Sequence, residues 1–494
     1  MKINPYIFRE YDIRGVAGEN FSEKALAEYE KWYGSFPGIT INLAVAEAIG
    51  KAYGTIICRE GGKRVLVGRE IRPFAEQLTS AFIKGIRSTG CAVVDAGEAI
   101  TPMVYFGIAY FNFDGGVNVT GSHNVYFFNG FKIMRKGVAP IFGEELQQMR
   151  KMVEEEDFGK GAEGSYEKMN IMTAYRDYLL GHIKLERPLK VVLDCGNGST
   201  GLIMPSLLKD FGCEVIEMYT MPDASFPNHV PDPEDPNNMK ELAARVVAEG
   251  ADCGVGLDAD GDRVGFVDEK GEFLDADELV IILAEDALSR NPGKKILFDV
   301  KCTRLLQDLI PQYGGVALMH RTGHAPIKDI LRKDPDIIFA GEESGHLFFV
   351  QDYFRIDDGV FGALKILALA AKIKGPFSDL FADIPYSVRT PDLKLPCKDA
   401  KKFKIVKSLS DYFSTKYETI TIDGVRVVFD KTSWGLVRAS NTAPYLTIRF
   451  EAETKERLLE LKNIFADQLE KFPEVMDKLD RNNVASRTGR LGWI

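Results

Sequence analysis

The 494-residue chain is too long for one hydrophobic core, and a guide of about 150 residues per domain predicts three or four domains. Its 45% hydrophobic and 27% charged residues are typical of a soluble globular protein, which argues against a disordered or fibrous one. The net charge of −10 argues against nucleic acid as the main partner, because phosphate-backbone binding needs a basic surface.

The N-terminal stretch MKINPYIFREYDIRG lacks the apolar block of a signal peptide, so we expect a cytoplasmic protein. No apolar run approaches the roughly 20 residues that span a bilayer, so we expect no membrane partner. The seven cysteines are scattered singly, without metal-ligand spacing, and are predicted to be mostly buried and reduced.

A pattern of strand, helix and strand occurs three times along the chain. Its copies begin at KRVLVGRE (residue 63), LKVVLDCGNG (189) and KKILFDVKC (294). In each copy a helix ends at glycine before the next strand, as helices commonly do. This spacing predicts βαβ units and a mixed or mostly parallel sheet in each copy.

Each copy then reaches a further apolar strand that is followed directly by a polar cluster. The three clusters lie in GGVNVTGSHN, CGVGLDADGDR and DIIFAGEESGH. Ligands of such sheets collect outside the carboxyl ends of the strands. We therefore interpret the clusters as parts of a site rather than as solvated turns.

The first cluster, NVTGSHNVYFFNGFKI, places Ser122, His123 and Asn124 on a loop at a strand end, with Lys132 further on. These three side chains compete with the backbone for hydrogen bonds and are poor material for the interior of a helix or strand. Alone, the triplet would be interpreted as a polar turn.

The second cluster places Asp258, Asp260 and Asp262 at alternate positions. Three carboxylates this close repel one another unless a cation lies among them, and oxygen ligands suit Mg²⁺ or Ca²⁺. An EF-hand is disfavoured, because Arg263 stands where that loop needs glycine. Arg263 can instead brace an anion beside the metal.

Two further loops carry polar side chains that can bind hydroxyl groups or a phosphate. GEESGH offers Glu342, Ser344 and His346, and a carboxylate with a hydroxyl can bind vicinal hydroxyl groups. After about residue 385, strands with an Asp-Gly turn and a long amphipathic helix predict a smaller α+β domain. Its stretch RASNTAPYLTIRF can hold a phosphate with the residues Arg438, Ser440, Asn441, Thr442 and Arg449.

Taken together, these loops resemble those of the α-D-phosphohexomutase superfamily, closest to its phosphomannomutase/phosphoglucomutase branch. The matching motifs are Thr-Gly-Ser-His-Asn at 120–124, Asp-x-Asp-x-Asp-Arg at 258–263, Gly-Glu-x-Ser-Gly-His at 341–346 and Arg-x-Ser-Asn-Thr at 438–442. YDIRG at 11–15, VLVGREIRP at 65–73, TPMVYF at 101–106 and DVKC at 299–302 match as well, so the resemblance covers essentially the whole chain.

The resemblance implies three similar α/β domains and a C-terminal α+β domain around one cleft. We expect them at residues 1–165, 166–290, 291–387 and 388–494. It also implies a phosphosugar mutase that interconverts hexose 1- and 6-phosphates of mannose or glucose. In this expectation Ser122 is phosphorylated, and Mg²⁺ binds to Asp258, Asp260, Asp262 and a phosphoserine oxygen. A hexose 1,6-bisphosphate is both the intermediate and the activator.

The resemblance further implies a role for each loop. His123 would support Ser122. The sugar would be contacted by Glu342, Ser344 and His346, and the non-reacting phosphate would be bound by the 438–442 loop with Arg449. His324 or Lys132 could be the general base. The cleft would be lined by Tyr11, Arg14, Lys132, Lys301 and His324.

Several positions depart from the family's pattern. Gly121, Val125 and Ala443 replace the usual Ala, Pro and Glu, and the first two should loosen the serine loop. An extra segment at 18–38 could cap the cleft or form a contact surface. A phosphoglucosamine or phosphopentose mutase, a phosphatase using Ser122 and a silent phosphosugar-binding protein remain as alternatives. The protein could be a monomer or a homodimer.

Overall fold

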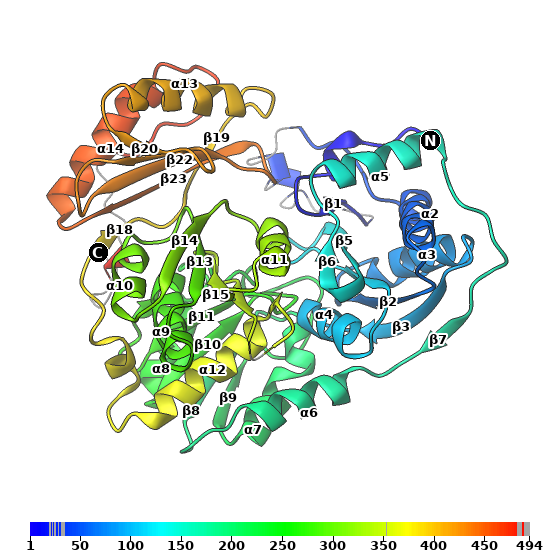
Figure 1. Cartoon of the computed structure of the whole chain (residues 1–494), viewed down its shortest axis with the longest axis horizontal. Coiled ribbons are helices and arrows are strands. Elements are labelled where there is room, and N and C mark those ends of the chain that lie inside the picture. The colour runs from blue at the N-terminus through cyan, green and yellow to red at the C-terminus, as the bar shows by residue number, and fades with distance from the viewer. Residues whose placement is uncertain are drawn as a thin grey trace.

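The computed structural model describes residues 1–18, 21, 23, 26, 27, 29, 30, 35–351, 353–481, 487 and 488. Its strands form four sheets, each with its own helices (Figure 1). In Figure 1 the first sheet lies on the right, the fourth lies at the upper left, and the second and third lie below and between them.

The first sheet has the strand order β1-β5-β4-β2-β3-β7, with β6 paired to β5. Helices α2, α3 and α5 pack together with one apolar cluster of the domain, whereas α4 joins a different cluster. The strands are β1 (Ile13–Val16), β2 (Arg64–Arg69), β3 (Ala92–Glu98), β4 (Gly115–Val119), β5 (Phe128–Arg135), β6 (Ala139–Pro140) and β7 (Tyr166–Lys168). The helices are the short η1 (Pro5–Ile7) and η2 (Lys136–Val138), then α2 (Leu43–Arg59), α3 (Ala75–Arg87), α4 (Thr101–Tyr110) and α5 (Glu144–Glu155).

The second sheet has the order β12-β11-β10-β8-β9 and is reached through α6 (Met172–His182). Its strands are β8 (Lys190–Asp194), β9 (Glu214–Met218), β10 (Cys253–Leu257), β11 (Val264–Asp268) and β12 (Phe273–Leu274). Its helices are η3 (Ser199–Leu202), α7 (Met204–Phe211) and α8 (Lys240–Glu249).

The third sheet has the order β14-β13-β15-β16-β17. Its strands are β13 (Lys295–Asp299), β14 (Val316–His320), β15 (Ile337–Gly341), β16 (Leu347–Phe349) and β17 (Ile356–Asp357). Its helices are α9 (Ala276–Arg290), α10 (Leu305–Gln312), α11 (His324–Lys333), α12 (Gly359–Lys372) and η4 (Phe377–Phe381).

The expected threefold repeat is present in these sheets. In each, three parallel strands (β3-β2-β4, β9-β8-β10 and β14-β13-β15) are followed by an antiparallel one (β5, β11 and β16). The three polar clusters occupy the turns between the last parallel strand and its antiparallel neighbour. The repeat therefore carries its functional loop at one corresponding place in all three domains.

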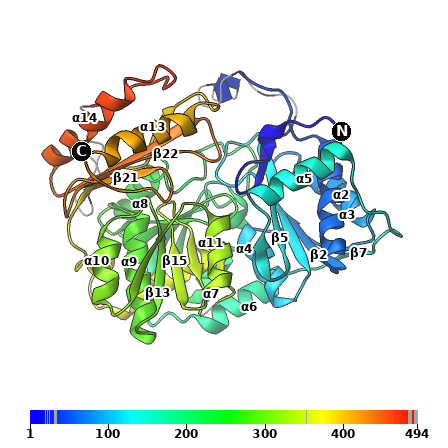
Figure 2. The same ribbon diagram turned by 45° about the horizontal axis from the view of Figure 1, so that its top comes forward.

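The fourth domain has a sheet of order β20-β21-β22-β23-β18-β24, with β19 paired to β23. Helices α13 (Lys402–Ser414) and α14 (Lys455–Leu469) cover it, and Figure 2 shows both above the third-domain helices. The strands are β18 (Val388–Arg389), β19 (Leu393–Pro396), β20 (Glu418–Ile420), β21 (Val425–Val428), β22 (Trp434–Ala439), β23 (Tyr445–Ala452) and β24 (Arg487–Thr488).

Two domain limits differ from those expected at 165 and 290. Strand β7 pairs with β3, so residues up to 168 belong to the first sheet. Helix α9 packs on β15, so the third domain begins near residue 276 rather than at 291. In both places the sequence pattern shows an element but not the sheet that it joins.

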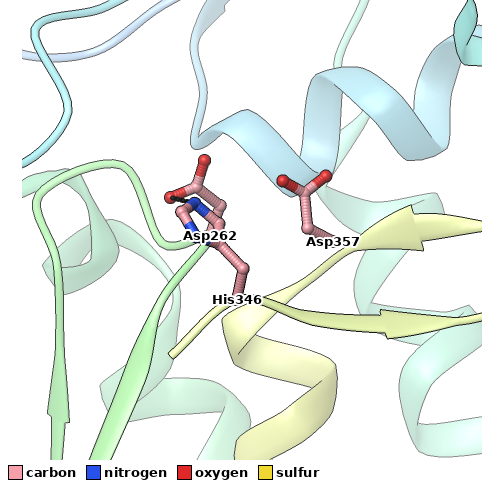
Figure 3. Close-up of side chains that lie close together, drawn as sticks. All are labelled: Asp262, His346 and Asp357. Carbon is pink, nitrogen blue, oxygen red and sulfur yellow. Dashed lines mark ion pairs between the residues drawn. The ribbon is translucent and has the colours of Figure 1, made fainter. Parts of the chain in front are cut away.

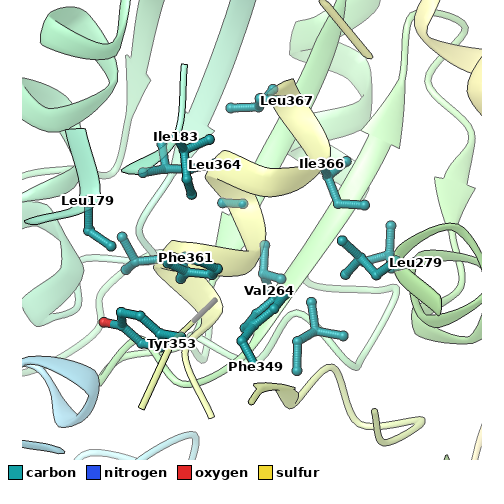
Figure 4. Close-up of a cluster of buried hydrophobic side chains, with 14 of the residues drawn as sticks. Leu179, Ile183, Val264, Leu279, Phe349, Tyr353, Phe361, Leu364, Ile366 and Leu367 are labelled. Carbon is teal, nitrogen blue, oxygen red and sulfur yellow. The ribbon is translucent and has the colours of Figure 1, made fainter. Parts of the chain in front are cut away.

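One apolar cluster runs through the first three domains, while the fourth has its own. Figure 4 shows α12 residues Phe361 and Leu364 among side chains of the second and third domains, including Val264 and Phe349. All seven cysteines are free, and all but the half-buried Cys58 are buried. Among the described residues, none of the helices is both long and apolar enough to cross a bilayer.

Candidate active site

A cleft of about 770 Å³ lies where the four domains meet, and residues from every domain line it. Most of the predicted site residues are in its wall. They are Tyr11, Arg14, Ser122, His123, Lys132, Arg263, Lys301, His324, Glu342, Ser344, His346, Arg438, Ser440, Asn441 and Thr442. Segments more than 400 residues apart in sequence therefore face one space.

Ser122 lies on the turn between β4 and β5 with a left-handed backbone (φ 50°). Its N–H donates to the hydroxyl of Thr120 at 2.8 Å, and its own hydroxyl donates to Asp258 Oδ2 at 3.2 Å. The Nδ1 atom of His123 is 3.3 Å from the same hydroxyl. The nucleophile candidate thus lies directly beside the carboxylate triad.

Arg72 holds the serine loop from behind. Its guanidinium has five N–H donors, and four of them reach loop carbonyls, those of Ser122, Asn124, Val125 and Phe128. The fifth donates to Glu70, whose carboxylate also accepts the N–H of Gly121. Because Arg72 and Glu70 are buried, these hydrogen bonds fix the backbone conformation of the loop.

The carboxylates of Asp258, Asp260 and Asp262 are fully buried, and one oxygen of each lies within 4.8 Å of the others. The Lys132 ammonium pairs with Asp260 at 2.8 Å and with Asp262, so a cation already lies among them. Asp260 Oδ1 is buried without a hydrogen-bond partner, and Asp262 Oδ1 has no hydrogen bond but lies 3.4 Å from His346 Nε2. Oxygen ligands of this kind fit Mg²⁺.

The ionisation of this group follows its charges. Burial, together with Asp262 and Asp260, raises the pKa of Asp258 well above its usual range. Burial works against the charged form of Lys132 as well, but Asp260 and Asp262 outweigh it and raise the pKa of that amine. Lys132 is therefore a fixed positive charge at the triad.

His346 connects the triad with the rest of the 341–346 loop, as Figure 3 shows for its ring against Asp262. Its Nε2 is 3.4 Å from Asp262 Oδ1, and its Nδ1 is 3.0 Å from the hydroxyl of Ser344. Asp357 lies nearby, but Lys328 pairs with it at 2.8 Å within the buried interior. The charge of Asp357 is thus balanced by Lys328.

Glu342 accepts the N–H of Gly323 at 2.6 Å and lies 3.4 Å from His346 Nδ1. Burial raises the pKa of Glu342 to about 7, and Asp299 adds to that shift while His346 opposes it. A buried carboxylate of this kind can accept or donate a hydrogen bond with a sugar hydroxyl near neutral pH.

The turn between β22 and β23 forms the opposite wall. Ser440 accepts the N–H groups of Thr442 and Ala443, which fixes the turn, and Asp423 holds Arg438 at 3.0 Å. Asn441 donates to the Tyr11 hydroxyl at 2.6 Å, and that hydroxyl donates to the Thr322 carbonyl at 2.6 Å. Tyr11 therefore joins the first, third and fourth domains across the cleft.

His324 lies at the N-terminus of α11, with Nε2 3.2 Å from Asp12 Oδ2. Arg14 pairs with the same carboxylate at 3.1 Å and donates to the Thr120 carbonyl at 3.1 Å. Although burial alone would raise the pKa of Asp12, His324, Arg14 and Lys132 lower it. Asp12 is thus a charged partner for His324 and one that sequence patterns did not single out.

Comparisons with known proteins agree with this geometry. The sequence matches the phosphoglucomutase/phosphomannomutase profiles for alpha/beta/alpha domains I, II and III at 5–160, 173–271 and 275–387, and that for the C-terminal domain at 393–468. It is 40% identical over 464 residues to the phosphomannomutase/phosphoglucomutase of Pseudomonas aeruginosa, covering 94% of this chain and 95% of that one. The chain belongs to the phosphoglucomutase/phosphomannomutase family.

Two further relatives support the assignment to this family. The phosphoglucomutase of Neisseria gonorrhoeae is 35% identical over 474 residues, covering 95% of this chain and 98% of its own. A phosphoglucomutase/phosphomannomutase family protein from Burkholderia thailandensis has a crystal structure that superposes with a TM-score of 0.85 at 35% identity. That match covers 97% of this chain and all of the other.

Arg449 does not line the cleft of this family member. It is fully buried and donates to the carbonyls of Lys301 (2.6 Å) and Thr390 (3.2 Å), and it pairs with Asp277 at 2.9 Å. Arg449 follows the cleft residue Thr447 by two positions on β23, or about 7 Å, on the same face. The third domain covers that face there, so Arg449 supports the Lys301 segment instead of the substrate.

The described part of the extra segment 18–38 lies against the serine loop. The rings of Phe21 and Tyr29 are 5.8 and 5.9 Å from those of Phe127 and Phe128, respectively. Tyr29, Ser35 and Pro37 line the cleft. The rest of this segment lies outside the described residues.

Proposed function

We propose that this protein is a mutase that interconverts hexose 1-phosphate and hexose 6-phosphate through a phosphorylated Ser122. The observation that carries the proposal is the 3.2 Å contact between the Ser122 hydroxyl and Asp258 of the buried triad. The Arg438–Thr442 turn lines the same cleft and suits a second phosphate.

In the proposed reaction the bond between phosphorus and Ser122 Oγ breaks, and a new bond forms to the free hydroxyl oxygen of the sugar phosphate. The product is a sugar bisphosphate. After it turns over in the cleft, its other phosphate returns to Ser122. A hexose 1,6-bisphosphate would accordingly act as activator by loading the serine.

Asp258, Asp260, Asp262 and a phosphoserine oxygen would hold Mg²⁺, which offsets charge on the transferring phosphoryl group when bound. Arg263 and Lys132 add positive charge at the same place. His123, 3.3 Å from the serine hydroxyl, orients that group.

Of the two predicted general bases, we propose that His324 accepts the proton of the sugar hydroxyl. Its Nε2 faces the charged Asp12, which can stabilise an imidazolium. Lys132 is bound to two carboxylates that favour its charged form, so it serves as a cation. Glu342, Ser344 and His346 would hold the sugar in both orientations.

We propose mannose and glucose phosphates as substrates. Relatives carry both names, since the Pseudomonas protein is a phosphomannomutase/phosphoglucomutase, the Neisseria protein a phosphoglucomutase and an Escherichia coli relative with 32% identity a phosphomannomutase. A cytoplasmic location and a monomeric or homodimeric state remain predictions from the sequence.

The test is incubation with mannose 1-phosphate or glucose 1-phosphate, Mg²⁺ and a catalytic amount of the bisphosphate. Appearance of sugar 6-phosphate supports a mutase, release of inorganic phosphate indicates the phosphatase, and turnover of only glucosamine or pentose phosphates indicates those mutases. Intact-mass measurement should find one phosphoryl group on the wild type and none on Ser122→Ala, with Ser289→Ala on α9 as the exposed control. Full activity of Ser122→Ala would overturn the proposal.

A further inference from the structure

Lys394 lies in line with Arg438 and Thr447, two residues of the fourth domain that line the cleft. On β19 it pairs directly with Thr447 of β23, and Thr447 pairs on its other side with Arg438 of β22. Residues opposite one another on neighbouring strands point to the same face. Arg438, Thr447 and Lys394 therefore form one row, and all three line the cleft.

The described lining of the cleft includes seven Lys and Arg side chains. Six of them are ion-paired with a carboxylate within 4.0 Å. The pairs are Arg9–Asp399 (3.7 Å), Arg14–Asp12 (3.1 Å), Lys132–Asp260 (2.8 Å), Arg263–Glu234 (2.8 Å), Lys301–Asp392 (2.7 Å) and Arg438–Asp423 (3.0 Å). Lys394 is the described exception.

The surroundings of Lys394 keep its amine positive. The ammonium lies 5.9 Å from the centre of the Tyr445 ring, and the side chain is exposed to the cleft. Tyr445 contributes most to raising the pKa of this amine, burial opposes it, and Glu234, Asp232 and Asp392 raise it further. An exposed, charged amine without a close carboxylate has donors available for a ligand.

We propose that Lys394 is a further phosphate-binding residue of this cleft, holding together with Thr447 and Arg438 the phosphate that is not transferred. The proposal rests on the proposed function, because it takes a sugar phosphate as the ligand. Neighbouring strands lie about 4.8 Å apart, so the backbones of Arg438 and Lys394 are separated by about 10 Å. Their long side chains can converge on one phosphate above Thr447.

This position predicts a particular kinetic effect. A phosphate that binds Lys394 displaces no ion pair, whereas at Arg438 it competes with Asp423. The non-reacting phosphate stays in place while the other is transferred, so its contact is equally strong in the ground state and the transition state. Loss of such a contact raises KM and leaves kcat nearly unchanged.

The experiment compares the wild type with Lys394→Met, which keeps the length of the side chain, and Lys394→Arg, which keeps the charge. For glucose 1-phosphate we expect KM to rise about tenfold or more in Lys394→Met, with kcat within about twofold, and to recover in Lys394→Arg. Lys404→Met, exposed on α13 of the same domain, should match the wild type. An unchanged KM in Lys394→Met, or a loss confined to kcat, would overturn the proposal.

An equilibrium titration of each variant with glucose 1-phosphate separates this inference from the proposed function. If the wild type turns over no sugar phosphate, the mutase proposal fails, yet weaker binding by Lys394→Met still supports the role of Lys394. Equal binding by the wild type and Lys394→Met rejects it. If Lys394 instead held Glu234 across the cleft, Glu234→Gln would reproduce the Lys394→Met effect, and that result would also contradict the proposal.

Discussion

The guanidinium of Arg72 lies directly against Gly121, the residue before the proposed nucleophile Ser122. A Cβ atom added to Gly121 would overlap Arg72 and would lie 2.5 Å from the Phe128 carbonyl oxygen. The sequence suggested that glycine at this position loosens the loop, but the structure shows another role. The glycine permits the close approach through which Arg72 holds the loop carbonyls.

Gly121→Ala should accordingly impair the enzyme. Forcing a methyl group into a packed site costs about 1–3 kcal/mol of stability, and a shift of the serine by about 1 Å can cost about 100-fold in rate. We expect the larger effect on kcat, measured with glucose 1-phosphate. Gly181→Ala on α6, where an added Cβ meets nothing within 4 Å beyond its chain neighbours and the backbone of its own helix, is the matched control and should keep full activity.

Arg72→Lys tests the same contact from the other side. Lysine keeps the charge beside Glu70 but has three donors instead of five, so at least two of the five acceptors, and at least one loop carbonyl, lose their partner. We predict a fall in kcat of about tenfold or more and a smaller phosphorylated fraction of Ser122 by intact mass. Arg245→Lys, an exposed pair with Glu249 on α8, should change neither quantity.

Removal of the metal should stop turnover, and Mg²⁺ should restore it. Asp260→Asn removes a charge that also binds Lys132 at 2.8 Å, so we expect the half-saturating Mg²⁺ concentration to rise about tenfold or more. Asp411→Asn, exposed on α13, is the control. An unaltered Mg²⁺ response in Asp260→Asn would contradict the metal site.

Tyr11→Phe removes the hydroxyl that joins three domains and keeps the ring. Two hydrogen bonds of about 1 kcal/mol each are lost, which predicts a rise in KM of up to about 30-fold because the three domains are held less firmly around the cleft. Steady-state kinetics check this, with the exposed Tyr386→Phe as control. A wild-type KM would show that the Tyr11 contact does not hold the cleft.

Asp358 predicts a pH effect on stability. The carboxyl caps α12 and accepts the hydroxyl groups of Tyr175 and Tyr353, and burial raises its pKa to about 7. The folded protein therefore binds this proton at a pH where the unfolded chain has released it. The stabilisation is present below about pH 4 and is lost as the pH rises to about 7, by up to about 1.4 kcal/mol per pH unit.

The measurement is the thermal unfolding midpoint of the wild type and Asp358→Asn between pH 5 and pH 8. The stability of the wild type relative to the variant should decrease as the pH rises. The same comparison with the exposed Asp383→Asn should show no such trend. A constant difference between wild type and Asp358→Asn would refute the raised pKa.

The repeats and the loop positions were predictable because they depend on local patterns. Each predicted loop residue in the first three domains follows a strand whose apolar run is visible in the sequence. The partners of these residues were not predictable, because Asp12 meets His324 only through the packing of the first domain on the third. Arg449 was wrongly predicted to contact the substrate. Its sequence position is close to the cleft residues, and only the fold shows that the third domain covers it.

The apolar cluster shared by the first three domains determines which parts of this chain can be exchanged between relatives. Replacing the second domain alone would set foreign side chains against Phe361 and Leu364 of α12, which comes from the third. The fourth domain has its own apolar cluster. It meets the third through a small apolar cluster of Val300, Trp434 and Leu436 and through buried charges such as Arg426, which donates to the carbonyls of Val300 and Cys302. A chimaera could therefore exchange the fourth domain if its contact residues in the third domain were exchanged with it. The first three domains would have to be exchanged together.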